Sequence, residues 1–215
     1  MLSSDTTLVY FVRHGETDWN EQRRFQGQAD RVLNLIGLDQ AVAVARWLAE
    51  TGIEFSALYS SDLQRCVETA EEISKRTPLP IITTPALREI DCGLWEGLTS
   101  DEIEARFPGQ LTAWRSHVAL YVIPGGESVL QVQARMSAFY HETLAKHPGE
   151  TIIIVSHGAA LAALFAELEN LPLGQVWNDP LKRLKNTSVT VMLYDHTLDA
   201  HITTLFNSVE HLLEV

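Results

Sequence analysis

The feature that most constrains the fold is a pair of apolar runs that each end on a histidine and a glycine. The first is "LVYFVRHG", residues 8–15, and the second is "TIIIVSHG", residues 151–158. Uninterrupted apolar runs rich in β-branched and aromatic residues predict strands buried on both faces, as in parallel sheets covered by helices. The glycine lets the chain turn sharply where each strand leaves the sheet. If the two strands are neighbours, His14 and His157 face each other at the carboxyl edge of the sheet.

Segments with helical spacing alternate with further strand-like runs, which predicts an α/β layer fold with a largely parallel sheet. Ser61 with Gln64, and Ser128 with Gln131, stand at capping-box spacing and predict the starts of two helices. The expected strands cover residues 8–12, 55–59, 80–83, 151–155, 188–194 and 202–206. The expected helices cover residues 38–49, 61–73, 100–106, 128–143 and 159–169.

The composition limits the partners that such a fold can take. The chain has 215 residues, 46% of them hydrophobic, and no linker-like stretch. We expect one domain over residues 1–215, with an inserted rim or lid segment at about 88–127. The net charge of −12 makes nucleic acid and an anionic membrane poor partners. An anionic substrate therefore has to be captured by a local cluster of positive groups.

The cysteines and the N-terminus favour a cytoplasmic protein. Cys66 and Cys92 are too few for a disulfide framework, so we expect reduced thiols. Residues 1–7 are short and polar and lack the apolar core of a signal peptide. No apolar run approaches the roughly 20 residues that a membrane span needs.

Charged side chains from several places converge on the edge that carries the two histidines. Arg13 precedes His14, Arg65 lies early in the helix after the second strand, and Glu89 follows the third strand. The helix after His157 directs free N–H groups and the positive end of its dipole to the same space. Since sites in such sheets form at the carboxyl ends of the strands, we expect these five side chains to form one site.

These side chains have the chemistry of a phosphoryl-transfer site. Arginine matches phosphate oxygens bidentately, and two arginines with a histidine balance the charge of a phosphate dianion. A neutral histidine can attack phosphorus, while a carboxyl group protonates the leaving oxygen and later deprotonates water. Because the arginines supply the positive charge and the other histidines lack zinc-ligand spacing, we expect no metal and no cofactor.

The chain resembles the histidine phosphatase superfamily, also called the phosphoglycerate mutase-like family, over nearly its whole length. A single "RHG" would be weak evidence, whereas an ordered set of blocks is specific. The blocks are, in order, "RHGETDWN", "RRFQGQAD", "LNLIGLDQA", "YSSDLQRCVETAE", "LREIDCGLWEGLT", "PGGES" and "VSHGAAL". The resemblance implies a three-layer α/β/α sandwich with a mostly parallel central sheet.

The resemblance also implies a role for each matching residue. His14 would be the nucleophile that becomes phosphohistidine, and Glu89 would be the proton donor. The residues that would bind and stabilise the phosphoryl group are Arg13, Arg65 and His157. Those that would line the phosphate pocket are Asn20, Gln26, Gly27 and, through its backbone, Gly158.

The family contains phosphatases, which give the phosphoryl group to water, and mutases, which return it to a sugar acid. Mutases that depend on bisphosphoglycerate resemble this chain but carry a lysine at the position of Ser100 and an adjacent arginine pair further on. No adjacent arginine pair occurs between Glu89 and His157. The sequence therefore favours a metal-independent phosphatase for small-molecule phosphomonoesters, with a phosphoglycerate mutase as the alternative. A catalytically inactive phosphate-binding module is disfavoured because all five central residues are present.

Three points stay open at this stage. Glu96 and Glu127 are further carboxylates near the same edge, so the proton donor is open between them and Glu89. Five aromatic residues would either wall the substrate cavity or pack in the core: Trp19, Phe25, Trp95, Trp114 and Tyr121. Homodimer formation is also open.

Overall fold

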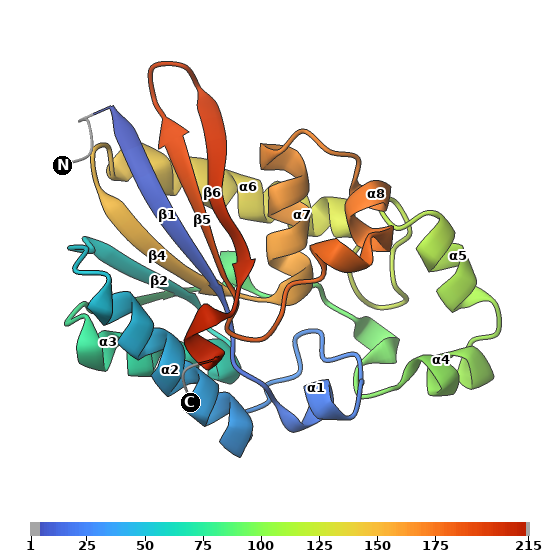
Figure 1. The fold of residues 1–215 in the computed structure, drawn as a ribbon. Helices are drawn as coiled ribbons and strands as arrows, with labels where there is room; N and C mark the ends of the chain where they lie inside the picture. The colour runs from blue at the N-terminus through green and yellow to red at the C-terminus, as the bar shows by residue number, and fades with distance from the viewer. Residues whose placement is uncertain (1–4, 214–215) are drawn as a thin grey trace.

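A six-stranded sheet forms the centre of the molecule in the computed structural model, which describes residues 5–213 (Figure 1). The strand order is β3-β2-β4-β1-β5-β6. The first four strands in this order are parallel to one another, whereas β5 and β6 are antiparallel to their neighbours. The strands are β1 (Thr6–Arg13), β2 (Ala57–Ser61), β3 (Ile81–Thr84), β4 (Thr151–Ser156), β5 (Val189–Asp195) and β6 (Ala200–Ser208).

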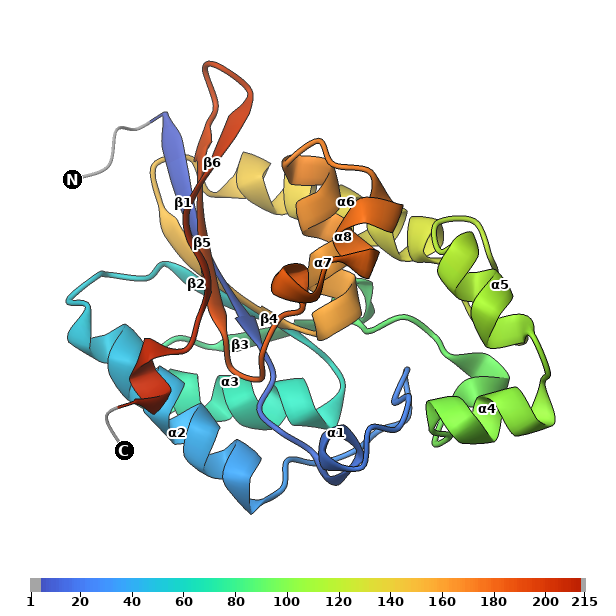
Figure 2. The ribbon, with the colours of Figure 1, turned by 45° about the vertical axis from the view of Figure 1, so that its right-hand side comes forward.

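Helices cover both faces of the sheet and give three layers (Figures 1 and 2). One face carries α2 (Leu35–Glu50) and α3 (Gln64–Arg76), and the other carries α6 (Val129–Lys146) and α7 (Gly158–Leu168). The remaining helices are short: α1 (Asp18–Glu21), α4 (Ser100–Arg106), α5 (Gln110–Ser116) and α8 (Leu173–Asn178). Single 3₁₀ turns cover Pro85–Leu87, Gly93–Trp95, Pro180–Lys182 and Glu210–Leu212. The predicted α/β/α sandwich with a mostly parallel sheet is confirmed.

The run of apolar residues in β1 follows from its place between the two helical layers. Val9 and Phe11 belong to the core cluster under α6 and α7, while Tyr10 and Val12 belong to the cluster under α2 and α3. None of the four side chains is more than 6% exposed. Because successive side chains of a strand alternate between faces, a strand between two helical layers has to be apolar throughout.

The two strands that end on histidines are adjacent and parallel, which meets the condition for His14 and His157 to share an edge. Arg13 at the end of β1 pairs with Ser156 at the end of β4. The backbone N–H of His14 donates to the carbonyl of Ser156 at 3.0 Å. Both strands therefore deliver His14 and His157 to the same edge of the sheet.

The two capping predictions have different outcomes. Ser128 caps α6 and forms the expected capping box with Gln131, whose N–H donates to the serine hydroxyl at 3.3 Å. Ser61 does not cap α3, because it is the last residue of β2 and the N-cap is Leu63, which makes no side-chain cap bond. That prediction was wrong since the strand continues two residues beyond Tyr59.

The segment between β3 and α6 carries α4 and α5 on the side of the molecule away from the N-terminus (Figure 2). That residues 88–127 act as an inserted rim of a single domain stays a prediction. Within residues 5–213, no helix is both long and apolar enough to cross a membrane. Residues 1–4, part of the segment in which the sequence predicts no signal peptide, lie outside the described residues.

Candidate active site

His14 lies directly after β1, and its side chain is only 2% exposed. Its Nδ1 lies 2.7 Å from the carbonyl oxygen of Gly15. A carbonyl can only accept, so Nδ1 carries the proton and Nε2 is the nitrogen with a free lone pair. The turn needs a glycine at position 15, because a Cβ there would collide with the backbone of Gly37. The fold therefore fixes the tautomer of His14 and leaves the lone pair of Nε2 available at the pocket.

Arg13 places a cation beside the start of α7. Its Nη1 donates to the carbonyl of Leu184 at 2.6 Å, while its buried Nε has no partner within the described part of the chain. A Cβ at Gly158 would lie 3.3 Å from this Nε, so the glycine lets the guanidinium approach the helix. Burial lowers the pKa of Arg13, yet an arginine remains charged at neutral pH. Arg13 is thus a half-buried cation with an unused buried donor.

Arg65 reaches the same edge from the first turn of α3 and is fully buried. Its Nη1 donates to the carbonyl of Ala29 at 2.9 Å, and its Nη2 donates to that of Gly27 at 2.8 Å. Its Nε lies 3.2 Å from Nδ1 of His157, which must accept. Nε2 of His157 then carries the proton and donates to the hydroxyl of Ser61 at 2.8 Å. Ser61 thus orients His157 rather than capping a helix.

The rings of His14 and His157 face each other with their centroids 5.2 Å apart. Burial, followed by the charge of Arg65, lowers the pKa of each histidine well below the ordinary value of 6.5. Both rings are therefore neutral at pH 7. The neutral form is the one in which a histidine can attack phosphorus.

Glu89 binds the N-terminus of α7 with its carboxylate. One oxygen accepts from the N–H of Ala159 at 3.0 Å, and the other accepts from Ala160 and from Ile90, both at 2.9 Å. A helix N-terminus stabilises a negative charge through these free N–H groups. The sequence predicts that this helix end faces the phosphate directly, whereas two of its N–H groups hold Glu89 instead. The helix thereby fixes the carboxylate at the pocket wall.

Arg135 of α6 holds the loop that carries Glu89. Its Nη1 donates to the carbonyls of Ala86 at 3.0 Å and Arg88 at 2.6 Å, and its Nη2 donates to that of Glu89 at 2.8 Å. The same guanidinium forms a two-point ion pair with Glu127, at 3.1 and 3.0 Å. Sequence reasoning missed Arg135. Its side chain donates to carbonyls that lie 46 to 49 positions earlier in the chain, and such distant hydrogen bonds produce no recognisable motif in the sequence.

The three carboxylates that the sequence leaves open lie in different surroundings. Glu127 is held by Arg135, and Glu96 accepts the N–H of Gln28 at 2.6 Å. Of the three, only Glu89 lines the pocket that His14 also lines. Position therefore favours Glu89 as the proton donor.

Asn20, Gln26 and Gly27 line the same pocket. The side-chain oxygen of Asn20 accepts from the amide of Asn186 at 3.2 Å, which fixes the orientation of Asn20. Gln26 is 9% exposed, and its Oε1 is buried without a partner among residues 5–213. Gly27 has a φ of +55°, a conformation that favours glycine, and its carbonyl accepts from Arg65.

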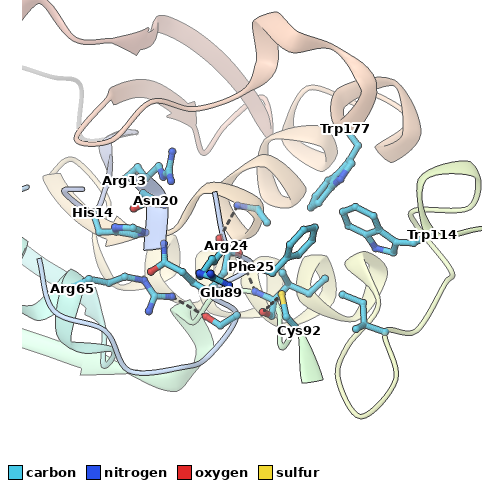
Figure 3. A pocket seen from close by; sticks show the side chains of 15 residues that line it. Arg13, His14, Asn20, Arg24, Phe25, Arg65, Glu89, Cys92, Trp114 and Trp177 are labelled. Atoms are coloured by element: carbon cyan, nitrogen blue, oxygen red, sulfur yellow. Dashed lines mark hydrogen bonds between the residues drawn. The ribbon is translucent and has the colours of Figure 1, made fainter. Parts of the chain in front are cut away.

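The pocket that these residues line has a volume of about 180 Å³ and adjoins a larger cavity of about 620 Å³. Gly158 lines the larger cavity. The residues that line both are Arg13, Phe25, Glu89, Trp114, Ala159 and Trp177. Figure 3 shows His14 and Arg65 at one end of the pocket and Trp114 and Trp177 at the other, with Glu89 between them.

The aromatic wall contains only some of the residues that the sequence offers for it. Trp95 and Tyr121 stack with ring centroids 6.1 Å apart, and neither lines the two cavities. Trp95 is fully buried, so it packs in the core. The wall is formed by Phe25 and Trp114, which the sequence offers, together with Trp177. Sequence reasoning missed Trp177, because its segment joins the site only through the packing of α8.

A family model described as the histidine phosphatase superfamily (branch 1) matches residues 9–204. This range contains every site residue described above and nearly the whole sheet.

Named proteins are similar over most of the chain. A glucosyl-3-phosphoglycerate phosphatase of Mycobacterium tuberculosis is 38% identical over 173 residues, which cover 77% of this chain and 76% of that protein. A probable phosphoglycerate mutase, GpmB, of Proteus mirabilis is 38% identical over 193 residues, which cover 88% and 86%. The solved structure of YhfR from Bacillus stearothermophilus has a TM-score of 0.85 at 34% identity and covers 96% of this chain and 99% of its own.

Proposed function

The chain belongs to the histidine phosphatase superfamily, and from that premise we propose that it hydrolyses small phosphomonoesters through a phosphohistidine at His14. One observation carries the proposal furthest. The buried, neutral His14 has its Nε2 free in a pocket that also contains Arg13 and Arg65. A nucleophile between two cations suits attack on a phosphate dianion.

In the first step, the Nε2 lone pair of His14 forms a bond to phosphorus while the bond from phosphorus to the alcohol oxygen breaks. Glu89, in its acid form, gives its proton to that oxygen, so that a neutral alcohol leaves. Arg13 and Arg65 balance the charge on the other phosphoryl oxygens. The unpartnered Nε of Arg13 is a donor for one of them.

In the second step, water attacks the phosphorus of the phosphohistidine, and Glu89, now a carboxylate, takes the proton of the water. The bond from phosphorus to nitrogen breaks, its electron pair returns to Nε2, and inorganic phosphate leaves. His157, whose ring lies 5.2 Å from that of His14, bonds through its two ring nitrogens to Arg65 and Ser61 and lines neither cavity, so its part in this assignment is to orient Arg65. The remaining pocket residues of this assignment are Asn20, Gln26, Gly27 and the backbone of Gly158.

The test is hydrolysis of p-nitrophenyl phosphate in the presence of EDTA between pH 5 and 8. Because Arg13 and Arg65 supply the positive charge, we expect turnover that a chelator does not reduce. Turnover that EDTA removes and Mg²⁺ restores would overturn metal independence. An absence of turnover at every pH would overturn the enzyme assignment in favour of a phosphate-binding module.

A phosphoglycerate mutase is the second candidate, and the 38% identity to GpmB supports it. The two activities separate by product. With 3-phosphoglycerate, a phosphatase releases inorganic phosphate, whereas a mutase forms 2-phosphoglycerate and is stimulated by 2,3-bisphosphoglycerate. ³¹P NMR of one reaction mixture distinguishes these products.

A cytoplasmic location, homodimer formation and a single domain with a rim at about 88–127 stay predictions.

A further inference from the structure

The segment that leads into β5 holds the strand end that carries the nucleophile. The backbone N–H of Arg13 donates to the carbonyl of Ser188 at 3.2 Å, and the N–H of Thr187 donates to that of His14 at 3.2 Å. Nη1 of Arg13 donates to the carbonyl of Leu184 at 2.6 Å. This segment therefore contacts two residues of the phosphate pocket, although Leu184 follows Arg13 by 171 positions.

Asn186 of the same segment bonds with its side chain to two residues of the phosphate pocket. Its Nδ2 donates to the carbonyl of His14 at 3.1 Å and to Oδ1 of Asn20 at 3.2 Å. A carbonyl can only accept, so the amide of Asn186 has to present its nitrogen here. Asn186 itself lines neither the phosphate pocket nor the larger cavity. Any effect that it has on phosphoryl transfer therefore passes through its partners.

The amide of Asn20 has one orientation that satisfies its neighbours. Its Oδ1 accepts from the backbone N–H and from the hydroxyl of Thr17, both at 3.2 Å. Because a backbone N–H can only donate, the oxygen of Asn20 has to face Thr17 and Asn186. The Nδ2 of Asn20 forms no hydrogen bond with any residue from 5 to 213. Since Asn20 lines the phosphate pocket, this nitrogen is the donor left for a phosphoryl oxygen.

The short helix α1 has little packing of its own to hold Asn20 in place. It has four residues, and none of them is buried. The bonds from Thr17, the N-cap of α1, orient the Asn20 amide within this helix. The amide of Asn186, in contrast, bonds to Asn20 and to the residue at the end of β1. Asn186 is therefore a bridge between the helix that carries the donor and the strand that carries the nucleophile.

We propose that Asn186 is a positioning residue for phosphoryl transfer, because its bridge sets the place of the Asn20 donor relative to His14. With the bridge present, Nδ2 of Asn20 and Nε2 of His14 meet the same phosphoryl group. Without the bridge, α1 can shift against the strand end, and a displacement of about 1 Å is enough to reduce the rate. The proposal rests on the proposed phosphatase function, because it concerns the same phosphoryl group.

The test is Asn186→Ala, which removes both bonds without adding charge or bulk. Asn34→Ala is the matched control, since Asn34 is also half-buried and lines neither cavity. Its side chain also forms two hydrogen bonds, with the N–H of Gly37 at 2.8 Å and with Glu16 at 2.9 Å. We would measure kcat/KM for phenyl phosphate and for ethyl phosphate, and inhibition by vanadate. Circular dichroism and melting temperature confirm that each variant is folded.

We expect Asn186→Ala to lower kcat/KM about tenfold, the lower end for one hydrogen bond to a charged group. The loss should be equal for the two esters, because the donor acts on phosphoryl oxygens and not on the leaving oxygen. The inhibition constant of vanadate, which mimics the transferring phosphoryl group, should rise by a similar factor. Asn34→Ala should lower the melting temperature through the loss of a helix cap and leave kcat/KM within about twofold of wild type.

A double-mutant cycle with Asn20→Ala separates positioning from general support of the fold. If Asn186 acts through Asn20, its removal should cost little more in the Asn20→Ala background, since the donor that it positions is absent. The carbonyl of His14 keeps the N–H of Thr187 as a partner in every variant. Losses that multiply across the cycle would show that Asn186 acts independently of Asn20 and would overturn the proposal.

The outcomes separate this proposal from the proposed function. If wild type is active and Asn186→Ala loses no more kcat/KM than Asn34→Ala, the positioning role is wrong and the phosphatase stands. The same holds if the loss depends on the leaving group. If wild type hydrolyses neither ester at any pH from 5 to 8, the phosphatase proposal fails and the positioning role fails with it.

Discussion

The two ends of the active-site cavity are built in different ways. At the inner end, His14 and Arg65 are buried and Arg13 is half-buried, and all three side chains bond to carbonyls of the backbone. At the outer end, Arg115 and Arg183 line the larger cavity as exposed side chains, without ion-pair partners among the residues described. The inner end is fixed before a substrate arrives, whereas the side chains of the outer cations have no such bonds.

This difference predicts a different sensitivity to substitution at the two ends. Groups that stabilise a transition state have to be pre-organised, since reorganisation during the reaction reduces their effect. Exposed cations contribute modest and salt-sensitive binding energy. We therefore expect changes at the inner end to reduce turnover far more than changes at the outer end.

The largest effect is expected from His14→Ala. Without Nε2 there is no nucleophile for the first step, so kcat should fall by about 10³-fold or more for every ester. Initial rates with p-nitrophenyl phosphate check this, with Arg115→Ala as the outer-end control that keeps most of its activity. Activity retained within tenfold of wild type would remove His14 from the mechanism.

Glu89→Gln should have the next largest effect, and its size should depend on the alcohol. An acid in the transition state contributes about 10²- to 10⁴-fold when the leaving oxygen needs a proton. We expect a loss in that range for an alkyl phosphate and a much smaller loss for p-nitrophenyl phosphate, whose phenolate leaves unaided. The measurement is kcat/KM over a series of phenols and alcohols of increasing pKa. An equal loss for all of them would indicate a binding role.

Arg135→Ala tests whether catalysis needs the hydrogen bonds from Arg135 to the loop that carries Glu89. We expect about a tenfold loss of kcat, concentrated on poor leaving groups, because the carboxylate would no longer be held at its hydrogen-bonding distance from the alcohol. The same change in a Glu89→Gln background should cost little more, since both act on one step. Arg135→Lys should recover part of the activity. Full additivity of the two losses would show that Arg135 acts on stability alone.

The sequence predicted the inner end far better than the outer end. Arg13, His14 and His157 sit where apolar runs stop, so the strand pattern alone brings them to one edge. Arg115 and Trp177 belong to α5 and α8, two short helices without a clear periodic signal, and they meet only through tertiary packing. Ser61 shows why the ends of elements are hard to predict from sequence. A serine between a strand and a helix can be the last residue of the strand or the N-cap of the helix, and the sequence does not distinguish the two.

The smallest predicted effect concerns pH and again separates the two ends. His14 and His157 have lower pKa values in the folded protein than the ordinary 6.5, because they are buried beside Arg65. The unfolded chain therefore binds more protons below about pH 6.5, and stability is lost as pH falls toward the folded pKa values. His211, whose burial lowers its pKa to about 4, adds to this trend.

We expect the melting temperature to fall by at least about 2–4 °C between pH 7 and pH 5, which corresponds to roughly 1 kcal/mol for a chain of this size. His14→Gln should reduce the difference between the two pH values, and the Arg115→Gln, Arg183→Gln double variant should leave it unchanged. A melting temperature that rises on acidification would contradict the neutral state of the two histidines.

The covalent intermediate tests the central claim most directly. The protein is mixed with a phosphomonoester, quenched within milliseconds in base, where phosphohistidine survives, and digested for mass spectrometry. The account predicts one phosphoryl group on the peptide that contains His14, formed and lost at rates compatible with turnover and absent from His14→Ala. Turnover without any phosphorylated histidine, or with the phosphoryl group on a different residue, would contradict it.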